Sequence, residues 1–167
     1  ELFRAQIPPA PLVANPGCYP TSAILALAPL LKAGLIEPCP IIVDSKSGVS
    51  GAGRTPKLTT HYPECNESIS AYNVGRHRHT PEIEQILTDF TGQKTTVLFQ
   101  PHVAAMDRGI AESIYCRPLR NVTTRQLDEL YRDFYQNERF VRVLDKPPAT
   151  KAVTYTNFCD VYATAVK

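Results

Sequence analysis

The residue best placed to do chemistry is Cys18, within the segment NPGCYPT at positions 15 to 21. A helix is expected directly after it, and the unpaired backbone N–H groups and the dipole at a helix start favour an anion such as a thiolate. Gly17 lets the backbone turn tightly beside the sulfur. Two interpretations stay open from these residues alone: a reactive nucleophile and a structural cysteine buried in the core.

A second segment, SGVSGAGR at positions 47 to 54, combines three glycines, two serines and Arg54 directly after an expected strand. Successive backbone N–H groups in such a loop form a nest for an anion, and a guanidinium suits phosphate or carboxylate. Its glycine spacing, GxxGxG, matches neither the GxGxxG dinucleotide fingerprint nor a phosphate-binding P-loop. The alternative is a flexible surface loop.

Two histidines, His77 and His79, stand between arginines in the segment RHRHT, just before an expected helix. Neighbouring cations favour a neutral imidazole, which is available as a base near neutral pH. The HxH spacing also occurs in metal sites, but no third ligand is evident, so no metal is expected. A further connection, residues 100–110, carries His102 and Arg108 between two expected strands, where substrate contacts are common.

The order of helix and strand signals predicts an α+β domain. A mixed, largely antiparallel sheet with helices on one face is expected, in a single domain over residues 1–167. The expected helices cover residues 20–32, 81–90 and 123–138, the last with a capping box formed by Thr123 and Gln126. The expected strands cover residues 41–43, 95–100, 111–117, 140–144 and 157–166, and residues 57–76 are expected to be irregular.

The composition limits the classes of partner. A net charge of +2 without a long run of either sign argues against nucleic acid or an anionic membrane as partner. Neither an apolar stretch of about 20 residues nor a signal-peptide pattern is present, so we expect a cytoplasmic protein. The five cysteines are too far apart to suggest a disulfide framework.

Five motifs together resemble the N-acetyl-γ-glutamyl-phosphate reductases, which reduce an acyl phosphate to a semialdehyde with NADPH in arginine biosynthesis. They are ANPGCYPTS at 14–22, SGVSGAGR at 47–54, HRHTPEIEQ at 77–85, PHVAAMDRGI at 101–110 and TNFCD at 156–160. The resemblance implies the catalytic-domain fold shared with glyceraldehyde-3-phosphate dehydrogenases and a homo-oligomer formed through the sheet. It also implies that NADPH binds mainly to a Rossmann domain that is absent here, together with a final helix. One departure is the lack of a glycine just before Thr156 and Asn157.

The resemblance also implies roles for individual residues. Cys18 would be the nucleophile that forms a thioester, and His77, preferred over His79, would exchange a proton with the substrate oxygen. The substrate-pocket residues would be Asn15, Ser47, Arg54, Tyr72, His79 and Arg108. Two rival hypotheses remain: a cysteine acyltransferase or hydrolase that uses no nicotinamide, and a non-catalytic assembly module.

Overall fold

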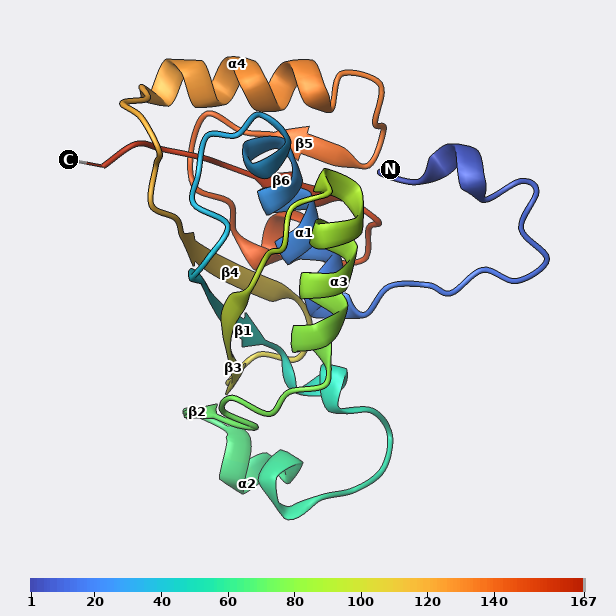
Figure 1. Cartoon of the computed structure of the whole chain (residues 1–167). Helices are drawn as coiled ribbons and strands as arrows, with labels where there is room; N and C mark the ends of the chain where they lie inside the picture. The colour runs from blue at the N-terminus through green and yellow to red at the C-terminus, as the bar shows by residue number, and fades with distance from the viewer. Residues whose placement is uncertain (167) are drawn as a thin grey trace.

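The main sheet has four strands: β1 (Ile41–Ser47), β2 (Ile69–Ala71), β3 (Val97–Ala104) and β4 (Ile110–Tyr115). The computed structural model describes residues 1–166, and the strand order is β2-β3-β1-β4. β1 and β3 run parallel, whereas β4 pairs antiparallel with β1, and β2 pairs antiparallel with β3 (Figure 1). The predicted mixed sheet is confirmed, with two of its three pairings antiparallel.

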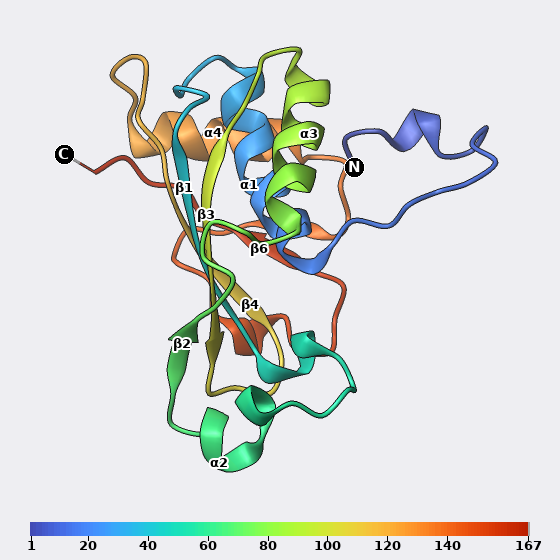
Figure 2. The same cartoon turned by 60° about the horizontal axis from the view of Figure 1, so that its bottom comes forward.

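Two helices cover one face of this sheet, here called the inner face: α1 (Cys18–Lys32) and α3 (His79–Thr91). α1 is apolar on nearly every side, and Ala23, Leu27 and Ala28 are fully buried. α3 buries Ile83 and Leu87 and ends at Gly92, whose φ of 72° is readily adopted only by glycine. Figure 2 shows both helices on the same side of β1 and β3. No helix within residues 1–166 is long and apolar enough to cross a membrane.

A third helix, α4 (Thr124–Phe134), packs on α1 from outside. It begins with the predicted capping box of Thr123 and Gln126. The hydroxyls of Tyr131 and Tyr135 donate to backbone carbonyls in the middle of α1. Beside it, β5 (Val141–Val143) and β6 (Cys159–Val161) form a separate two-stranded parallel sheet.

The other face of the main sheet, here called the outer face, carries an apolar row. Ile42 of β1 lies in register with Leu98 of β3 on one side and Tyr115 of β4 on the other. The three side chains are 40, 54 and 60% exposed. A row of large apolar side chains exposed across three adjacent strands is characteristic of a surface that another molecule covers.

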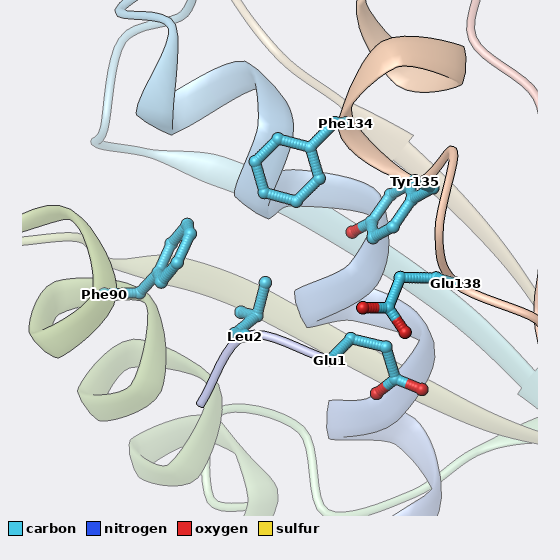
Figure 3. Close-up of a pocket in the computed structure, with 6 residues that line it drawn as sticks. All are labelled: Glu1, Leu2, Phe90, Phe134, Tyr135 and Glu138. Carbon is cyan, nitrogen blue, oxygen red and sulfur yellow. The ribbon is translucent and has the colours of Figure 1, made fainter. Parts of the chain in front are cut away.

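The N-terminal residues pack on the body of the protein before the chain reaches Cys18. A pocket between α3 and α4 is lined by Glu1, Leu2, Phe90, Phe134, Tyr135 and Glu138. Figure 3 shows the Leu2 side chain facing the same space as the rings of Phe90 and Phe134. Arg4, in a short 3-10 helix (Arg4–Gln6), forms an ion pair with Glu138. The pocket shares no residue with the predicted active site.

The structure differs from the sequence-based expectation mainly in its short elements. Residues 57–76, expected to be irregular, contain a 3-10 helix (Leu58–Thr60), the short helix α2 (Tyr62–Cys65) and strand β2. β2 is exposed along its whole length at the edge of the sheet, so it carries no alternation of buried and exposed residues to reveal it. The strand expected over 157–166 is limited to Cys159–Val161, because its partner β5 is only three residues long.

Candidate active site

Cys18 is the first residue of α1, and its side chain is exposed to solvent. Gly17 precedes the helix in an extended conformation, and its carbonyl accepts the first backbone bond from Thr21 N–H at 3.0 Å. The N–H groups of Cys18 and Tyr19 lie in the first turn, where no carbonyl of the helix can reach them. Pro20, at the third helical position, has no N–H group at all. Two backbone donors are therefore directed to the space beside the thiol.

Two side chains from the start of α3 fix the position of Gly17. The Gly17 N–H donates to Glu82 Oε1 at 2.8 Å. A Cβ atom placed on Gly17 would lie only 2.5 Å from His79 Nε2, so the imidazole packs directly against this glycine. Sequence analysis did not single out Glu82. The available signal was an acid three residues after His79 in the first turn of the helix.

His77 is buried in an aromatic cluster against Tyr19, the residue that follows Cys18. Only 8% of the residue is exposed, and its ring meets those of Tyr19, Tyr72 and Phe99 edge to face. The centroid distances are 5.7, 5.5 and 5.2 Å, respectively. The structure thus brings three of the predicted site residues, Tyr72, His77 and His79, around the turn that carries Cys18.

Both histidines are held in the neutral form. Burial lowers the pKa of His77, and the nearby His79 and Arg78 lower it further. Burial also lowers the pKa of His79, although the Glu82 carboxylate acts in the opposite direction. His77 Nδ1 accepts a hydrogen bond from the His79 backbone N–H at 3.1 Å, so the ring proton of neutral His77 resides on Nε2. The two imidazoles are therefore neutral as expected, but the main cause is burial and not the neighbouring Arg78.

Two tyrosines link this cluster to the sheet. Tyr72 donates its hydroxyl proton to the Tyr19 hydroxyl at 3.1 Å, and Tyr19 donates to the backbone carbonyl of His102 in β3 at 3.3 Å. Burial raises the pKa of both tyrosines, so both hydroxyls stay protonated at neutral pH. Tyr72 was predicted as a site residue. Tyr19 was not, although it follows Cys18 directly.

The glycine loop after β1 does not form the predicted anion nest with its first N–H groups. The N–H groups of residues 48–50 donate to the carbonyls of Gly109, Met106 and Asp107 at 2.9, 2.9 and 3.0 Å. They are therefore occupied by the loop that follows β3, and these three N–H groups are not free to bind an anion. Gly48 is needed for the close approach, because a Cβ atom there would lie 2.6 Å from the Asp107 carbonyl oxygen.

The remaining predicted residues lie around this junction of loops. Ser47 is buried at the end of β1, and its hydroxyl donates to the Gly48 carbonyl at 3.0 Å. Arg108 is more than half exposed and lies over the Tyr155 ring at 5.6 Å. Asn15 and Arg54 are exposed. Within residues 1–166, no hydrogen bond or ion pair joins Asn15, Arg54 or Arg108 to the histidine cluster, so these residues stay predictions.

The HxH spacing of His77 and His79 also occurs in metal sites. Across the described part of the chain, no group of three or more histidine, cysteine, aspartate or glutamate side chains is arranged to hold a metal ion. The chemistry that the site offers is instead that of an exposed thiol beside free backbone donors and a neutral imidazole.

Comparison with known proteins identifies related sequences. Residues 18–167 match the family model described as semialdehyde dehydrogenase, dimerisation domain. Proteins named N-acetyl-gamma-glutamyl-phosphate reductase are 54% identical in Geotalea daltonii, over 100% of this chain and 49% of the relative, and 56% identical in Pelobacter propionicus, over 96% and 47%. The chain thus spans about half the length of the curated relatives that it matches.

Solved structures share the fold at low sequence identity. A probable aspartate-semialdehyde dehydrogenase from Pseudomonas aeruginosa has a TM-score of 0.67 and 16% identity, over 96% of this chain and 54% of that one. An aspartate semialdehyde dehydrogenase from Candida albicans, solved with NADP, has a TM-score of 0.57 and 14% identity, over 84% and 44%.

Proposed function

Because the chain belongs to the semialdehyde dehydrogenase family, as its dimerisation domain, we propose that it is the catalytic half of an NADPH-dependent N-acetyl-γ-glutamyl-phosphate reductase of arginine biosynthesis. The observation that supports this best is the placement of Cys18: an exposed thiol at the start of α1, next to free N–H groups and directly after Gly17, against which a neutral histidine packs. The substrate class is taken from the relatives of this name, which are 54% and 56% identical to this chain.

The first step would be acyl transfer. The Cys18 thiolate attacks the γ-carbonyl carbon of the acyl phosphate, the C–O bond to phosphate breaks, and a thioester and inorganic phosphate result. The N–H groups of Cys18 and Tyr19 would stabilise the negative oxygen of the tetrahedral intermediate. Arg54 and Arg108, from the joined loops, would bind the phosphate and carboxylate of the substrate, with Asn15, Ser47, Tyr72 and His79 completing the pocket.

The second step would be reduction of the thioester. NADPH, held mainly by the part of the protein outside this chain, would supply the hydride. The residues of this chain hold the oxygen that becomes negative: His77 shares its Nε2 proton with it, and retains that proton as the oxyanion collapses and expels the Cys18 thiolate. The products are the semialdehyde and free enzyme, and no proton is gained or lost in this step.

A Rossmann domain and a final helix would complete the protein, and the glycine loop at 47–54 does not replace that domain. Its first three N–H groups are already used by the loop after β3, which leaves them unavailable to a pyrophosphate. We further propose that two copies of the chain associate through the outer face of the sheet, where the row of Ile42, Leu98 and Tyr115 is uncovered, and that the enzyme acts in the cytoplasm.

The decisive test is Cys18→Ser in the full-length protein. Reduction of the acyl phosphate, and the reverse, phosphate-dependent oxidation of the semialdehyde, should fall by at least about 1,000-fold, because a serine hydroxyl, unlike a thiol, stays un-ionised at neutral pH even beside these backbone donors. Cys39→Ser is the matched control, since Cys39 is also an exposed free cysteine but lies outside the site. Retained turnover in Cys18→Ser would contradict the proposal, and thioester or ester hydrolysis without NADPH would favour a hydrolase.

A further inference from the structure

One carboxyl group lies inside the protein without a cation. Glu112 is on the inner face of β4, between Ile110 and Ile114, which belong to the core. Its Oε1 accepts a hydrogen bond from the fully buried Ser45 of β1 at 2.8 Å. Its Oε2 is buried and has no hydrogen-bond partner. No lysine, arginine or histidine within residues 1–166 forms an ion pair with it.

This carboxyl group lies under the start of the helix that carries Cys18. The Ser22 hydroxyl of α1 is close enough to act on the Glu112 carboxyl, and it donates to the Tyr19 carbonyl at 3.2 Å. Ser22 comes four residues after Cys18, so the two lie on the same side of α1, one turn apart. Ser45 and Glu112 are opposite each other in register, which places the pair at the end of β1 that faces the site.

We infer that Glu112 is a positioning residue for the nucleophile: it holds the N-terminal part of α1 against β1 through Ser22 and Ser45. The inference rests on the proposed role of Cys18. Glu112 does not touch the reacting atoms, and it acts only through the helix that presents the thiol.

The surroundings explain why the carboxyl group would carry a proton. Burial raises the pKa of Glu112 to about 7, against the opposite effect of the hydrogen bond from Ser45 and of the nearby Ser22 hydroxyl. The groups that face it are the Ser45 hydroxyl on β1, the Ser22 hydroxyl on α1 and the Cys159 thiol on β6, none of which is a cation. Above this pH an unpaired negative charge would lie beneath the helix start, where it disfavours a thiolate and a well-packed first turn.

The experiment measures the rate of Cys18 alkylation by iodoacetamide, located by mass spectrometry, across pH. Glu112→Gln keeps the shape and the donor of the protonated acid but cannot ionise. The ratio of its rate constant to that of the wild type should be close to 1 near pH 6 and about three to ten near pH 8.5. Glu84→Gln is the matched control, because Glu84 Oε1 accepts from Val97 N–H at 3.0 Å, away from the helix start. Its ratio should stay close to 1 throughout.

A second measurement keeps the two proposals apart. The folded pKa of Glu112 is above its unfolded value, so the wild type should lose stability as pH rises from about 4.5 to about 7, and Glu112→Gln should lose less. Equal alkylation profiles in the two proteins would overturn the inference while leaving Cys18 as nucleophile. If Cys18 is unreactive in every variant, the nucleophile proposal fails. The contact of Glu112 with α1 is then tested by a double-mutant cycle of Glu112→Gln and Ser22→Ala. Zero coupling between the two substitutions in unfolding free energy would overturn that contact.

Discussion

The state of His77 follows from one backbone hydrogen bond. Its Nδ1 accepts from the His79 N–H, and protonating that nitrogen would set two N–H groups against each other. Burial disfavours the charged ring as well and lowers its pKa. The side chain is therefore better suited to donating a hydrogen bond from Nε2 than to accepting a proton at Nδ1. This favours stabilisation of a negative oxygen over the proton exchange that the resemblance implies.

Two amide substitutions distinguish these roles in the full-length protein. The side-chain nitrogen of His77→Gln can occupy the position of Nε2, whereas that of His77→Asn is closer to Nδ1. We expect His77→Gln to retain turnover within about tenfold of the wild type, and His77→Asn to lose about 100-fold or more in kcat, the usual cost of removing one oxyanion donor. Steady-state reduction rates provide the measurement. Equal, large losses in both variants would show that the ring itself must transfer a proton.

At the scale of secondary-structure elements, the site depends on the packing of the loop after β1 against the loop after β3. The loop after β1 and the loop after β3 are joined by three backbone hydrogen bonds, and these bring the segment of Arg54 next to that of Arg108. The parallel pairing of β1 with β3 places the two loops at the same end of the sheet. A 3-10 helix (Val49–Ala52) then forms where a nest was expected, because its first N–H groups are already bonded.

Alanine substitutions of two glycines in this loop test whether the loop needs glycine for close backbone packing or only for flexibility. Gly48→Ala should destabilise the protein by about 1–3 kcal/mol and weaken substrate binding, since its Cβ would meet the Asp107 backbone at 2.6 Å. Gly51→Ala serves as the control. Its Cβ would meet only the Ser47 hydroxyl at 2.8 Å, a side chain that can rotate away, so a change within about 1 kcal/mol is expected. Urea unfolding measures both changes in unfolding free energy. Equal changes in the two variants would contradict a close packing of the loop after β1 against the loop after β3.

For the molecule as a whole, the two faces of the sheet have different roles. The inner face is covered by α1 and α3 and contains the buried Ser45, which is hydrogen-bonded to the partly buried Glu112. The outer face carries the uncovered apolar row, which fits the dimerisation domain of the matched family. The core would thus support the nucleophile from one side of the sheet while a second copy packs on the other.

Leu98→Asp tests whether the outer face forms the interface. The side chain is more than half exposed in the single chain, so the variant should still fold, but a carboxylate inside an apolar interface would raise the dimer dissociation constant by about 100-fold or more. Sedimentation velocity over a range of concentrations measures this shift, with circular dichroism to confirm folding. Leu12→Asp, at another exposed leucine, should leave the dimer intact. A dimer unchanged by Leu98→Asp would place the interface elsewhere.

Much of the fold could be predicted because its main elements carry local signals. The helix after Cys18, the helix before Gly92 and the capping box at Thr123 depend on residues within a few positions of one another. Strand β1 was recognised from its β-branched run, although its polar half, up to Ser47, was not. That half is strand only because β3 and β4 flank it on both sides, and no local property records such pairing.

The candidate site divides in the same way. Cys18 and the two histidines could be named from their motifs, since a cysteine at a helix start and an HxH pair are local patterns. Glu82 on Gly17, the proton position of His77 and the unpaired carboxyl of Glu112 arise only when α1, α3 and the sheet come together. Each depends on atoms that are distant in sequence, as Gly17 and Glu82 are, and on burial that folding creates. The sequence therefore specified which groups could react, and packing set their protonation, their orientation and the donors around them.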